Sequence, residues 1–558
     1  MKKKILYLIL ASMLALGLVL TGCGGGEQEE EEEGDLRPAI TLGIVGPMAA
    51  AQGQHHVHGA ELAANEINGS NPAVDGVDVG GTLYKIELVE IDTNEVLNPS
   101  GADGVTRMEA NVDDVDFFLG GFRTEAVLAY REVAVGPGGA GKLFINCGAA
   151  TEALQYSVVD DYDNYKPWFK GTPPNELFLS TSMTKLLTAI IAGVQAATGN
   201  TTYAPKIAYL PENAAWTMVS RTLTVARLGP SGAKYLVGPA PYMWLPNPLA
   251  TVSEMNTLLE NMATYNPDII LTVMSGPCGT TFANRVGAYM PNALCLGINV
   301  DAQRGEFPNV AAYAKGMIFL DSWAPGVEYS DKTAPFVSAF EAEYGEVPIY
   351  TAATYDAVLS LVEAIEGTDS LDTDGIIAWM EDTDNAREGT SGTTAYYPKW
   401  DGVTTGANPF GVGGTLPALN EAQVLELYPW LAGAKYSNGA SIAAWAYDPN
   451  KWTMPQHTTH DLVYGPQWVT GSASQWQDVG GTLKKVGVWP MVVKSTLPTT
   501  LDGWLAAVNA GAINATTMAA LQGAGLWDQY GWWNFKYTGT GSLQIQTWVG
   551  WLMSKWRS

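Results

Sequence analysis

Residues 39–68 read AITLGIVGPMAAAQGQHHVHGAELAANEIN, and this stretch decides the fold. Ala39–Val45 is typical of a strand buried on both faces. The spacing of Ala60, Ala64 and Ile67 then predicts a helix with one apolar face. A buried strand followed at once by such a helix is the first half of a βαβ unit.

The same alternation of strands and helices continues along the chain in two series. In the first series we expect strands at 39–45, 84–88, 115–119 and 143–147. After a break at Gly171–Pro174, a second series is expected at 206–210, 234–237, 267–274, 293–298 and 316–320. Strands that alternate with helices indicate right-handed βαβ units and parallel sheets. We therefore expect an α/β protein with two Rossmann-like lobes, whose strand ends would face a common cleft.

The amino-acid composition excludes some classes of binding partner and some classes of fold. The chain has 558 residues, with 30 Lys plus Arg against 57 Asp plus Glu, and a formal net charge of −27. Such a chain repels nucleic-acid and polyphosphate backbones. Hydrophobic residues make up 47% of the chain, which is enough for large cores and excludes disorder by composition. Four cysteines exclude a scaffold held together by disulfides.

The N-terminus is expected to be an export signal. Lys2, Lys3 and Lys4 precede an apolar run, Ile5–Leu20, that is too short to span a bilayer. Leu20–Cys23 resembles the lipobox of prokaryotic lipoprotein signals, which implies removal of residues 1–22 and lipidation of Cys23. The alternative is an ordinary signal with a chance cysteine. The Gly/Glu-rich residues 23–37 predict an extended tether, so the body would be extracytoplasmic and anchored to the membrane by lipid.

Ile44–Met48 followed by Gly59–Asn68 resembles the opening of the type I periplasmic binding proteins, specifically their Leu/Ile/Val-binding branch. Other stretches agree in order: Gly120–Glu125, Ala149–Glu152, Tyr355–Val358, Glu363–Glu366, His460–Asp461, Gln475–Asp478 and Val488–Pro490. The resemblance implies two lobes joined by three hinge crossovers, near Thr172, Ser322 and Gly392. It also implies closure over a small ligand and delivery of that ligand to an ABC permease.

This resemblance sets the expected domain boundaries. Lobe 1 would comprise residues 38–172 and 323–392, and lobe 2 residues 173–322 and 393–490. Two segments depart from the family pattern: a β-rich insertion at about 397–456 and a C-terminal extension at 491–558. Fourteen of the 19 tryptophans lie between Trp400 and Trp556. They could form an interaction platform or fill the core of the added structure, and packing is the preferred interpretation.

Candidate ligand contacts in lobe 1 follow from the family's ligand loops, after the third and fourth strands. These loops offer Arg123, Thr124, Ala149, Ala150 and Thr151. The family binds a carboxylate with backbone N–H groups and hydroxyls at helix starts, whose dipole favours negative charge. Arg123 stands where a small hydroxyl residue is usual, and its guanidinium could grip a carboxylate bidentately. The alternative is a structural ion pair with Glu125 or Glu152.

Lobe 2 and the first loop supply the remaining candidates. The resemblance places Trp216 where an aromatic residue covers the ligand, although packing is an alternative role. Ser275 follows a strand, and Asp301 could pair with a ligand ammonium or merely cap a helix. Gln52 stands where the family carries a residue that covers the ligand.

Three further signals are weighed and set aside. Gly136–Lys142 resembles a phosphate loop, but Leu143 replaces the metal-binding hydroxyl and the stretch precedes a strand. His55, His56 and His58 could bind a metal, but we expect solvated residues at a helix start, and neither a metal nor a cofactor. Cys278 and Cys295 could form a disulfide, whereas three buried thiols, with Cys147, are slightly preferred.

The sequence therefore predicts a lipid-anchored solute-binding protein of an ABC importer that closes on a small polar ligand. An amino acid, an amide or a small carboxylate is the favoured ligand class. A sensor that presents the closed lobes to a signalling partner through residues 491–558 is the alternative. No nucleophile is recognisably paired with a base, so we do not expect an enzyme.

Overall fold

The computed structural model describes residues 35–151, 153–171, 175–230, 232–399, 459–462, 469, 471–489, 536–537 and 544–557. The chain divides into a short N-terminal unit, Met1–Pro38, and a body, Ala39–Ser558. The predicted signal, the lipidation site Cys23 and residues 400–456 of the predicted insertion lie outside the described residues. Within the described residues, no helix has both the length and the apolar character needed to cross a membrane.

The first sheet of the body has six strands in the order β2-β3-β1-β4-β5-β6. They are β1 (Ala39–Gly46), β2 (Val77–Val79), β3 (Thr82–Asp92), β4 (Phe117–Gly120), β5 (Phe144–Asn146) and β6 (Trp168–Lys170). All neighbours pair in parallel except β2 and β3, which form an antiparallel hairpin.

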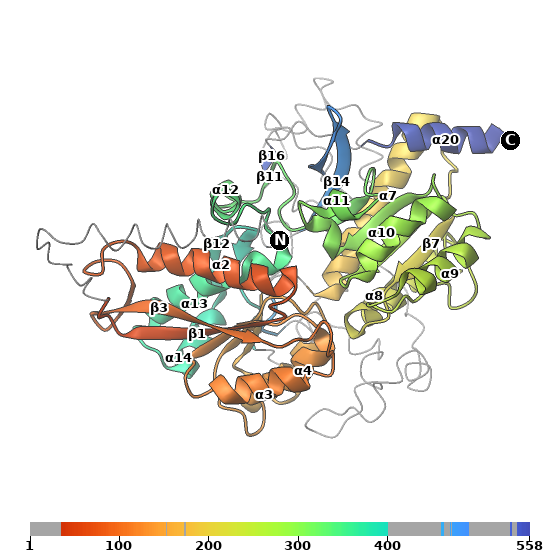
Figure 1. Cartoon of the computed structure of the whole chain (residues 1–558). Helices are drawn as coiled ribbons and strands as arrows, with labels where there is room; N and C mark the ends of the chain where they lie inside the picture. The colour runs from red at the N-terminus through yellow and green to blue at the C-terminus, as the bar shows by residue number, and fades with distance from the viewer. Residues whose placement is uncertain are drawn as a thin grey trace, which may run out of the picture. The chain divides into compact units, whose positions relative to one another are not determined.

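Helices cover both faces of the first sheet, α2 on one side and α3 and α4 on the other (Figure 1). They are α2 (Ala51–Asn68), α3 (Ala102–Asn111), α4 (Thr124–Ala134), α5 (Ala153–Asp160), α6 (Tyr162–Tyr165), α12 (Thr333–Tyr344), α13 (Thr354–Thr368) and α14 (Thr373–Met380). Ile40, Leu42 and Ile44 of β1 pack under α2 and α13. Because successive strand residues face opposite sides, Val45 packs on the α3 and α4 side.

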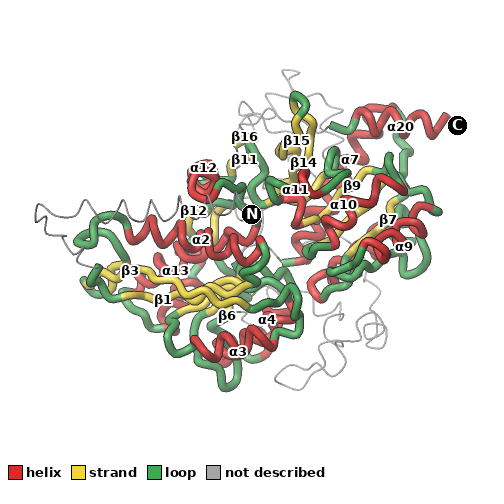
Figure 2. Tube along the Cα trace, viewed as in Figure 1, coloured by secondary structure: helices red, strands yellow, loops and turns green. Residues whose placement is uncertain are grey.

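The second sheet has the order β15-β14-β10-β9-β8-β7. Its strands are β7 (Ile207–Pro211), β8 (Ile269–Met274), β9 (Leu294–Asn299), β10 (Ile318–Asp321), β14 (Ser472–Val479) and β15 (Thr482–Trp489). The first four are parallel, and β14 and β15 add an antiparallel edge. Its helices are α7 (Glu176–Thr198), α8 (Met218–Leu228), α9 (Val252–Ala263), α10 (Cys278–Tyr289) and α11 (Phe307–Val310). Figure 2 shows the strands of each sheet lying between helices.

The expectation of an α/β protein with two Rossmann-like lobes is confirmed. One expected strand is wrong: residues 234–237 contribute only a single bridge, between Leu236 and Ile207. Lys234 has a φ of 61°, and the amides of Tyr235 and Leu236 both donate to Leu228 O. These bonds turn the segment back onto the end of α8 instead of extending it along the sheet.

The chain passes between the two lobes three times. The first passage lies between β6 and α7, the second between β10 and α12, and the third between the hairpin β12 (Arg387–Gly389), β13 (Gly392–Thr394) and β14. Ser322 lies in the second passage, and Thr172 lies outside the described residues. Gly392 is the first residue of β13 and so precedes the third passage, and the chain is still bridged to Lys170 of β6 at Asp461.

A buried carboxylate fastens the β12–β13 hairpin, which precedes the third passage, to α13 of lobe 1. Asp356 of α13 lies 3.0 Å from Arg387 Nη1 and accepts hydrogen bonds from the backbone N and the hydroxyl of Thr390, at 2.9 and 2.6 Å. Glu363 contacts the same arginine, 3.1 Å from its Nε, but its side chain is 42% exposed. Removing a buried partner leaves an uncompensated charge, whereas an exposed partner is largely replaced by water.

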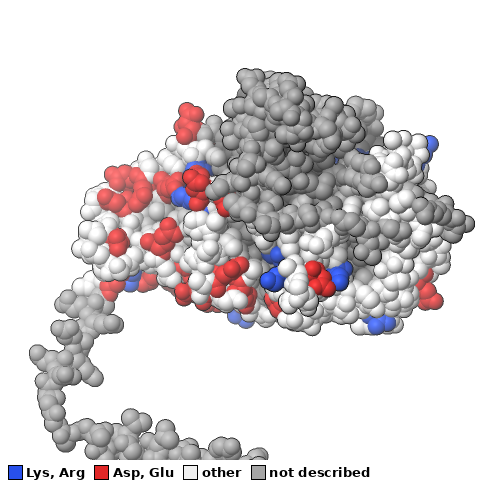
Figure 3. Space-filling model, turned by 90° about the horizontal axis from the view of Figure 1, so that it is seen from above, with Lys and Arg blue, Asp and Glu red and all other residues white. Residues whose placement is uncertain are grey.

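The described end of the C-terminal extension packs on lobe 2. Leu552 of α20 (Gln546–Arg557) is buried in the core beside α7, and Lys555 Nζ lies 2.6 Å from Asp268 Oδ1. Gln475 and Gln544 exchange two hydrogen bonds, at 2.9 and 3.1 Å. β16 (Lys536–Tyr537) pairs with β11 (Val327–Glu328) in the second passage. The face drawn in Figure 3 carries more acidic than basic side chains, which agrees in sign with the net charge of −27.

We expect Asp356→Ala to lower the free energy of unfolding by about 3–5 kcal/mol, because Arg387 would keep its buried charge without a buried partner. The matched variant Glu363→Ala should cost at most about 1 kcal/mol. Urea denaturation followed by circular dichroism measures both values. If the two variants lose the same free energy of unfolding, the buried pair of Asp356 and Arg387 is not the interaction that holds the β12–β13 hairpin.

Candidate functional site

An inner cavity lies where the strands of both sheets end. Phe122 follows β4, Trp216 and Ser275 follow β7 and β8, and Ser322 follows β10, and all of them line it. Ligands in open α/β sheets bind outside the carboxyl ends of the strands, so the position is the one the topology favours. The cavity has a volume of about 70 Å³. Since one water needs about 10–15 Å³ on this measure, the space fits a small molecule of several atoms.

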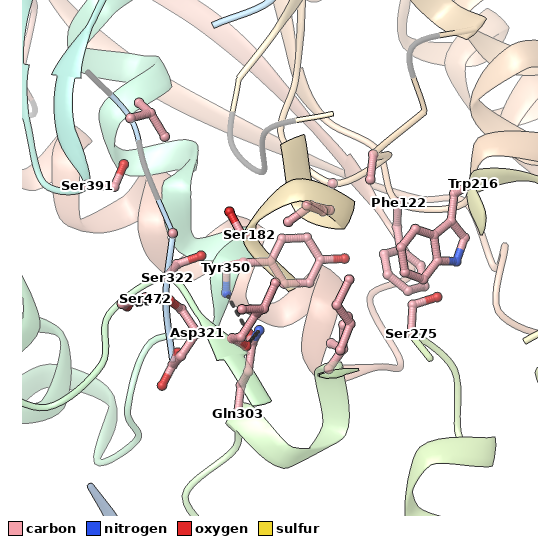
Figure 4. Close-up of a pocket in the computed structure, with 18 residues that line it drawn as sticks. Phe122, Ser182, Trp216, Ser275, Gln303, Asp321, Ser322, Tyr350, Ser391 and Ser472 are labelled. Atoms are coloured by element: carbon pink, nitrogen blue, oxygen red, sulfur yellow. Dashed lines mark hydrogen bonds between the residues drawn. The ribbon is translucent and has the colours of Figure 1, made fainter. Parts of the chain in front are cut away.

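Aromatic and apolar side chains form most of the wall. Phe122, Trp216 and Tyr350 are joined by Leu179, Ile298, Val300, Leu320 and Val469. Figure 4 shows Tyr350 in the middle of the cavity, with its hydroxyl directed toward Phe122 and Trp216. The Tyr350 backbone N donates to Gln303 Oε1 at 3.2 Å. Burial, reinforced by the charges of Glu212 and Glu95, holds the pKa of Tyr350 well above its usual range, so its hydroxyl stays a donor.

A fully buried carboxylate, Glu212, supports one end of this wall. It directly follows β7 and accepts from Trp216 Nε1 at 2.6 Å, from Ser275 Oγ at 2.5 Å and from Gly276 N at 3.0 Å. Ser275 therefore donates its one hydroxyl hydrogen to Glu212. Its oxygen is left as an acceptor for whatever occupies the cavity.

A second buried carboxylate, Glu95, supports the loop that carries Phe122. It accepts from Arg123 N and Thr93 Oγ1, both at 2.8 Å, and from the Tyr130 hydroxyl at 3.3 Å. Burial raises the pKa of Glu95 to about 7, although these donors oppose the shift. Gly120 makes the preceding turn possible: its φ is 110°, and a Cβ there would meet Val45 O.

An outer groove of about 890 Å³ adjoins the inner cavity. Phe122 and Ser275 line both spaces. The groove lies between the start of α2 on lobe 1 and the start of α10 on lobe 2. Gln52 Nε2 reaches from α2 to Ser275 O at 3.4 Å, which is a long contact across the boundary between the two lobes.

The nine candidate ligand contacts fall into three groups. The inner cavity is lined by Ala150, Trp216 and Ser275, and the outer groove by Gln52, Arg123, Ser275 and Asp301. Thr124, Ala149 and Thr151 line neither space. Thr151 Oγ1 donates to Glu176 Oε1 at 3.1 Å, Ala149 packs in the core, and Thr124 Oγ1 is buried with no hydrogen-bond partner among the described residues. Their roles in binding a ligand stay predictions.

Two charged candidates have partners within the protein, and their roles in binding a ligand stay predictions. Arg123 Nη2 lies 3.6 Å from Glu125 Oε1, so the structural ion pair is present, while Glu152 lies outside the described residues. Asp301 Oδ2 accepts from Thr280 N at 3.2 Å and from Thr280 Oγ1 at 2.6 Å. It therefore caps the first turn of α10, and burial raises its pKa.

Two expectations about reactive side chains can be settled. Cys147, Cys278 and Cys295 are all free and buried, so the disulfide alternative is wrong and the buried thiols are confirmed. The histidines are not solvated as expected: His55 and His56 are 1% and 0% exposed, because α2 lies under residues 346–354. No group of three metal-ligating side chains occurs within the described part of the chain.

Sequence reasoning missed Tyr350, Gln303 and Glu212. Tyr350 enters the site from the return of the chain to lobe 1, just before the motif at Tyr355–Val358 that carried the resemblance. Glu212 could have been found, since an acidic residue directly after a buried strand must be satisfied by neighbouring loops. Gln303 gave no such signal, because it lies in a short helical turn after β9.

The buried histidines attach α2 to the segment that carries Tyr350. Ile349 N donates to His55 Nδ1 at 3.2 Å, and His55 Nε2 lies 3.0 Å from Glu346 Oε2. His56 Nδ1 lies 3.0 Å from Thr351 O. Burial lowers the pKa of His55 to about 3 and that of His56 to about 4. Both imidazoles are therefore neutral in the folded protein near pH 6.

Because the folded pKa of His56 lies below the unfolded value of about 6.5, its contribution to stability is present above pH 6.5 and is lost as pH falls toward 4. As the pH falls through this window, the parent protein loses stability that His56→Asn does not lose. We therefore expect the free energy of unfolding of His56→Asn, relative to that of the parent protein, to rise by about 1.4 kcal/mol for each unit by which the pH falls. Urea denaturation of both proteins from pH 7.5 to 4.5 measures the difference. The raised pKa of Glu95 has the opposite effect on stability, but Glu95 is present in both proteins, so its contribution cancels in the difference. A difference in the free energy of unfolding that does not change with pH would contradict the expectation.

Comparisons with known proteins agree with this architecture. A family model described as "Periplasmic binding protein" matches residues 39–407. No curated protein matches the chain significantly. Among solved structures, the chain is similar to an ABC transporter substrate-binding protein from Sphaerobacter thermophilus, with 14% identity and a TM-score of 0.53 over 81% of this chain and 97% of that one.

Two further solved structures come with ligands. One is a solute-binding protein of an ABC transporter from Rhodopseudomonas palustris BisB5, in complex with 3,4-dihydroxybenzoic acid; it has 17% identity and a TM-score of 0.52 over 80% and 96% of the two chains. The other is the branched-chain amino acid transporter substrate-binding protein LivJ from Streptococcus pneumoniae, in complex with isoleucine; it has 17% identity and a TM-score of 0.51 over 81% and 99%. At these identities the likeness shows the fold.

Proposed function

We propose that this chain, which belongs to the periplasmic binding protein family, is the extracytoplasmic solute-binding component of an ABC importer. Members of the family bind solutes and are not enzymes, in agreement with the expectation from the sequence. The assignment to the Leu/Ile/Val-binding branch is part of this proposal. It is supported by the residues that resemble that branch.

One observation carries the proposal: a single small cavity has walls from both sheets and from the segment that returns between them. Phe122 comes from lobe 1, Trp216 and Ser275 from lobe 2, and Tyr350 from the returning segment. A ligand shifts an open–closed equilibrium only through its different affinity for the two states. A molecule in this cavity touches both lobes, so it would favour the closed form that a permease can recognise.

The chemistry of the wall supports a branched-chain or other amino acid, an amide or a small carboxylate. The apolar side chains suit an aliphatic or aromatic body. Ser275 offers an acceptor backed by the buried charge of Glu212, which suits an ammonium or amide N–H. The Tyr350 hydroxyl is a donor, which suits a carboxylate or carbonyl oxygen. Isoleucine and 3,4-dihydroxybenzoic acid, the ligands of two similar structures, both carry a carboxyl group.

We expect lipid attached to Cys23 to hold this binding protein at the membrane that contains the importer. Two or more acyl chains give stable attachment, which a single chain does not. We expect labelled palmitate to be incorporated into the parent protein and not into Cys23→Ala. The matched variant Cys147→Ala, which changes a buried thiol of the body, should keep the label. Label on Cys23→Ala would contradict the anchor.

We expect Tyr350→Phe to weaken binding about tenfold, because it removes one hydrogen bond to a polar ligand group and keeps the ring. A thermal-shift screen of amino acids, amides and small carboxylates first finds the ligand, since binding to the folded state raises its melting temperature. Isothermal titration calorimetry then compares the variants.

Tyr313→Phe is the matched control, because Tyr313 is 42% exposed and lines neither space. Its affinity should equal that of the parent protein. If no compound of the screen stabilises the parent protein, this choice of ligand class is wrong. If Tyr350→Phe binds as tightly as Tyr313→Phe, the inner cavity is not the site.

A further inference from the structure

The outer groove is larger than the inner cavity and adjoins it. The two volumes are about 890 and 70 Å³, and Phe122 and Ser275 line both spaces. A ligand whose first few atoms fill the inner cavity would therefore extend into the groove. The chemistry of the groove then decides which extensions are accepted.

Arginines dominate the charged lining of the groove. Arg123 comes from lobe 1, while Arg285 of α10 and Arg304 come from lobe 2. Asp301 is the one acidic residue in the same lining. Three cations at one groove are unusual in a chain with 57 acidic and 30 basic residues, because a random surface patch would be acidic.

The partners of these arginines leave positive charge in the groove. Arg304 forms a close ion pair with Glu306. Arg123 reaches Glu125 only at 3.6 Å, and Glu125 Oε1 also accepts from Ala215 N at 2.9 Å. Arg285 Nε donates to the neutral Asn256 Oδ1 at 2.7 Å, and no carboxylate among the described residues forms an ion pair with it. A guanidinium has five N–H donors, so Arg285 retains donors for an anion.

Two helix starts add to the positive potential. The first residues of α2 and α10 line the groove from opposite lobes, and neither helix has a side-chain cap on its N-cap residue. The positive end of each helix dipole favours a nearby anion. Asp301 opposes this field, but its Oδ2 already accepts two hydrogen bonds from Thr280. One capping carboxylate therefore does not neutralise the arginines.

We propose that the ligand is an elongated organic anion, one end of which fills the inner cavity and whose terminal carboxylate is held by Arg123 and Arg285 in the outer groove. The proposal rests on the proposed function, because it assigns the second half of the same ligand. Arginine holds carboxylates bidentately, with charge-assisted hydrogen bonds. Since the two arginines belong to different lobes, one carboxylate between them also stabilises the closed form.

The test uses succinate, glutarate and adipate as probes, each paired with its neutral diamide. Calorimetric titration of the parent protein should show at least one dicarboxylate binding about tenfold or more tightly than its diamide. Arg285→Gln can keep a hydrogen bond to Asn256 but loses the charge. It should weaken dicarboxylate binding about tenfold and leave the affinity for the best neutral compound of the thermal-shift screen unchanged. Arg123→Gln should behave in the same way.

Arg107→Gln is the matched control, because Arg107 is an exposed residue of α3 away from the groove. Its affinity for the dicarboxylates should equal that of the parent protein. If Arg285→Gln binds dicarboxylates as Arg107→Gln does, the groove site is wrong. If the parent protein binds neutral amino acids or amides but no dicarboxylate, the inference fails and the proposed function stands. Absence of binding by every compound overturns both.

Discussion

The site depends on two carboxylates that are buried at the ends of strands and therefore have to be satisfied. A buried charge is tolerated only when hydrogen-bond donors surround it. Glu212 draws in the indole of Trp216, the hydroxyl of Ser275 and the amide of Gly276. Glu95 draws in the amide of Arg123 and the hydroxyl of Thr93. The loops that form the cavity wall are thus fixed by groups that do not themselves line it, and the wall is organised before any ligand arrives.

This arrangement separates recognition into two chemical zones. Apolar side chains form most of the inner cavity, and its wall also carries polar side chains, among them Ser275, whose oxygen is left as an acceptor, and Tyr350, whose hydroxyl can donate. The outer groove is wide and cationic, although the chain as a whole is strongly acidic. An acidic surface reduces the capture of unrelated anions at a distance, so the groove would select an anion only when the rest of the molecule also fits.

Much of the fold could be predicted from the sequence, because the spacing of apolar residues and the Gly and Pro residues that end helices and strands are local features. Buried runs such as Ala39–Val45 and the helical spacing after them identify parallel βα units without any knowledge of distant contacts. The strand predicted at 234–237 was wrong because the amides of Tyr235 and Leu236 bond to Leu228 O at the end of α8, a contact that strand propensity does not report. Packing of residues 346–354 over α2 is equally invisible from sequence, which is why the burial of His55 and His56 was missed.

The candidate site was predicted in part for the same reason. Residues that follow strands, such as Trp216 and Ser275, could be placed because strand ends meet in this topology. Thr124 and Thr151 lie in the right loops, but the direction of their side chains depends on packing that spacing does not encode. Tyr350 comes from a return passage about 200 residues further along the chain than the ligand loops of lobe 1, so only the folded chain brings it to them.

The three sealed thiols have a consequence for a protein that works outside the cytoplasm. Thiolate is the form that oxidants attack, and burial raises the pKa of Cys147 and Cys295 to about 12, so the native molecule offers almost none. Only a chain that has opened its cores presents these three thiols to the surroundings. Oxidative damage at these positions would therefore record how often, and for how long, individual molecules have been unfolded.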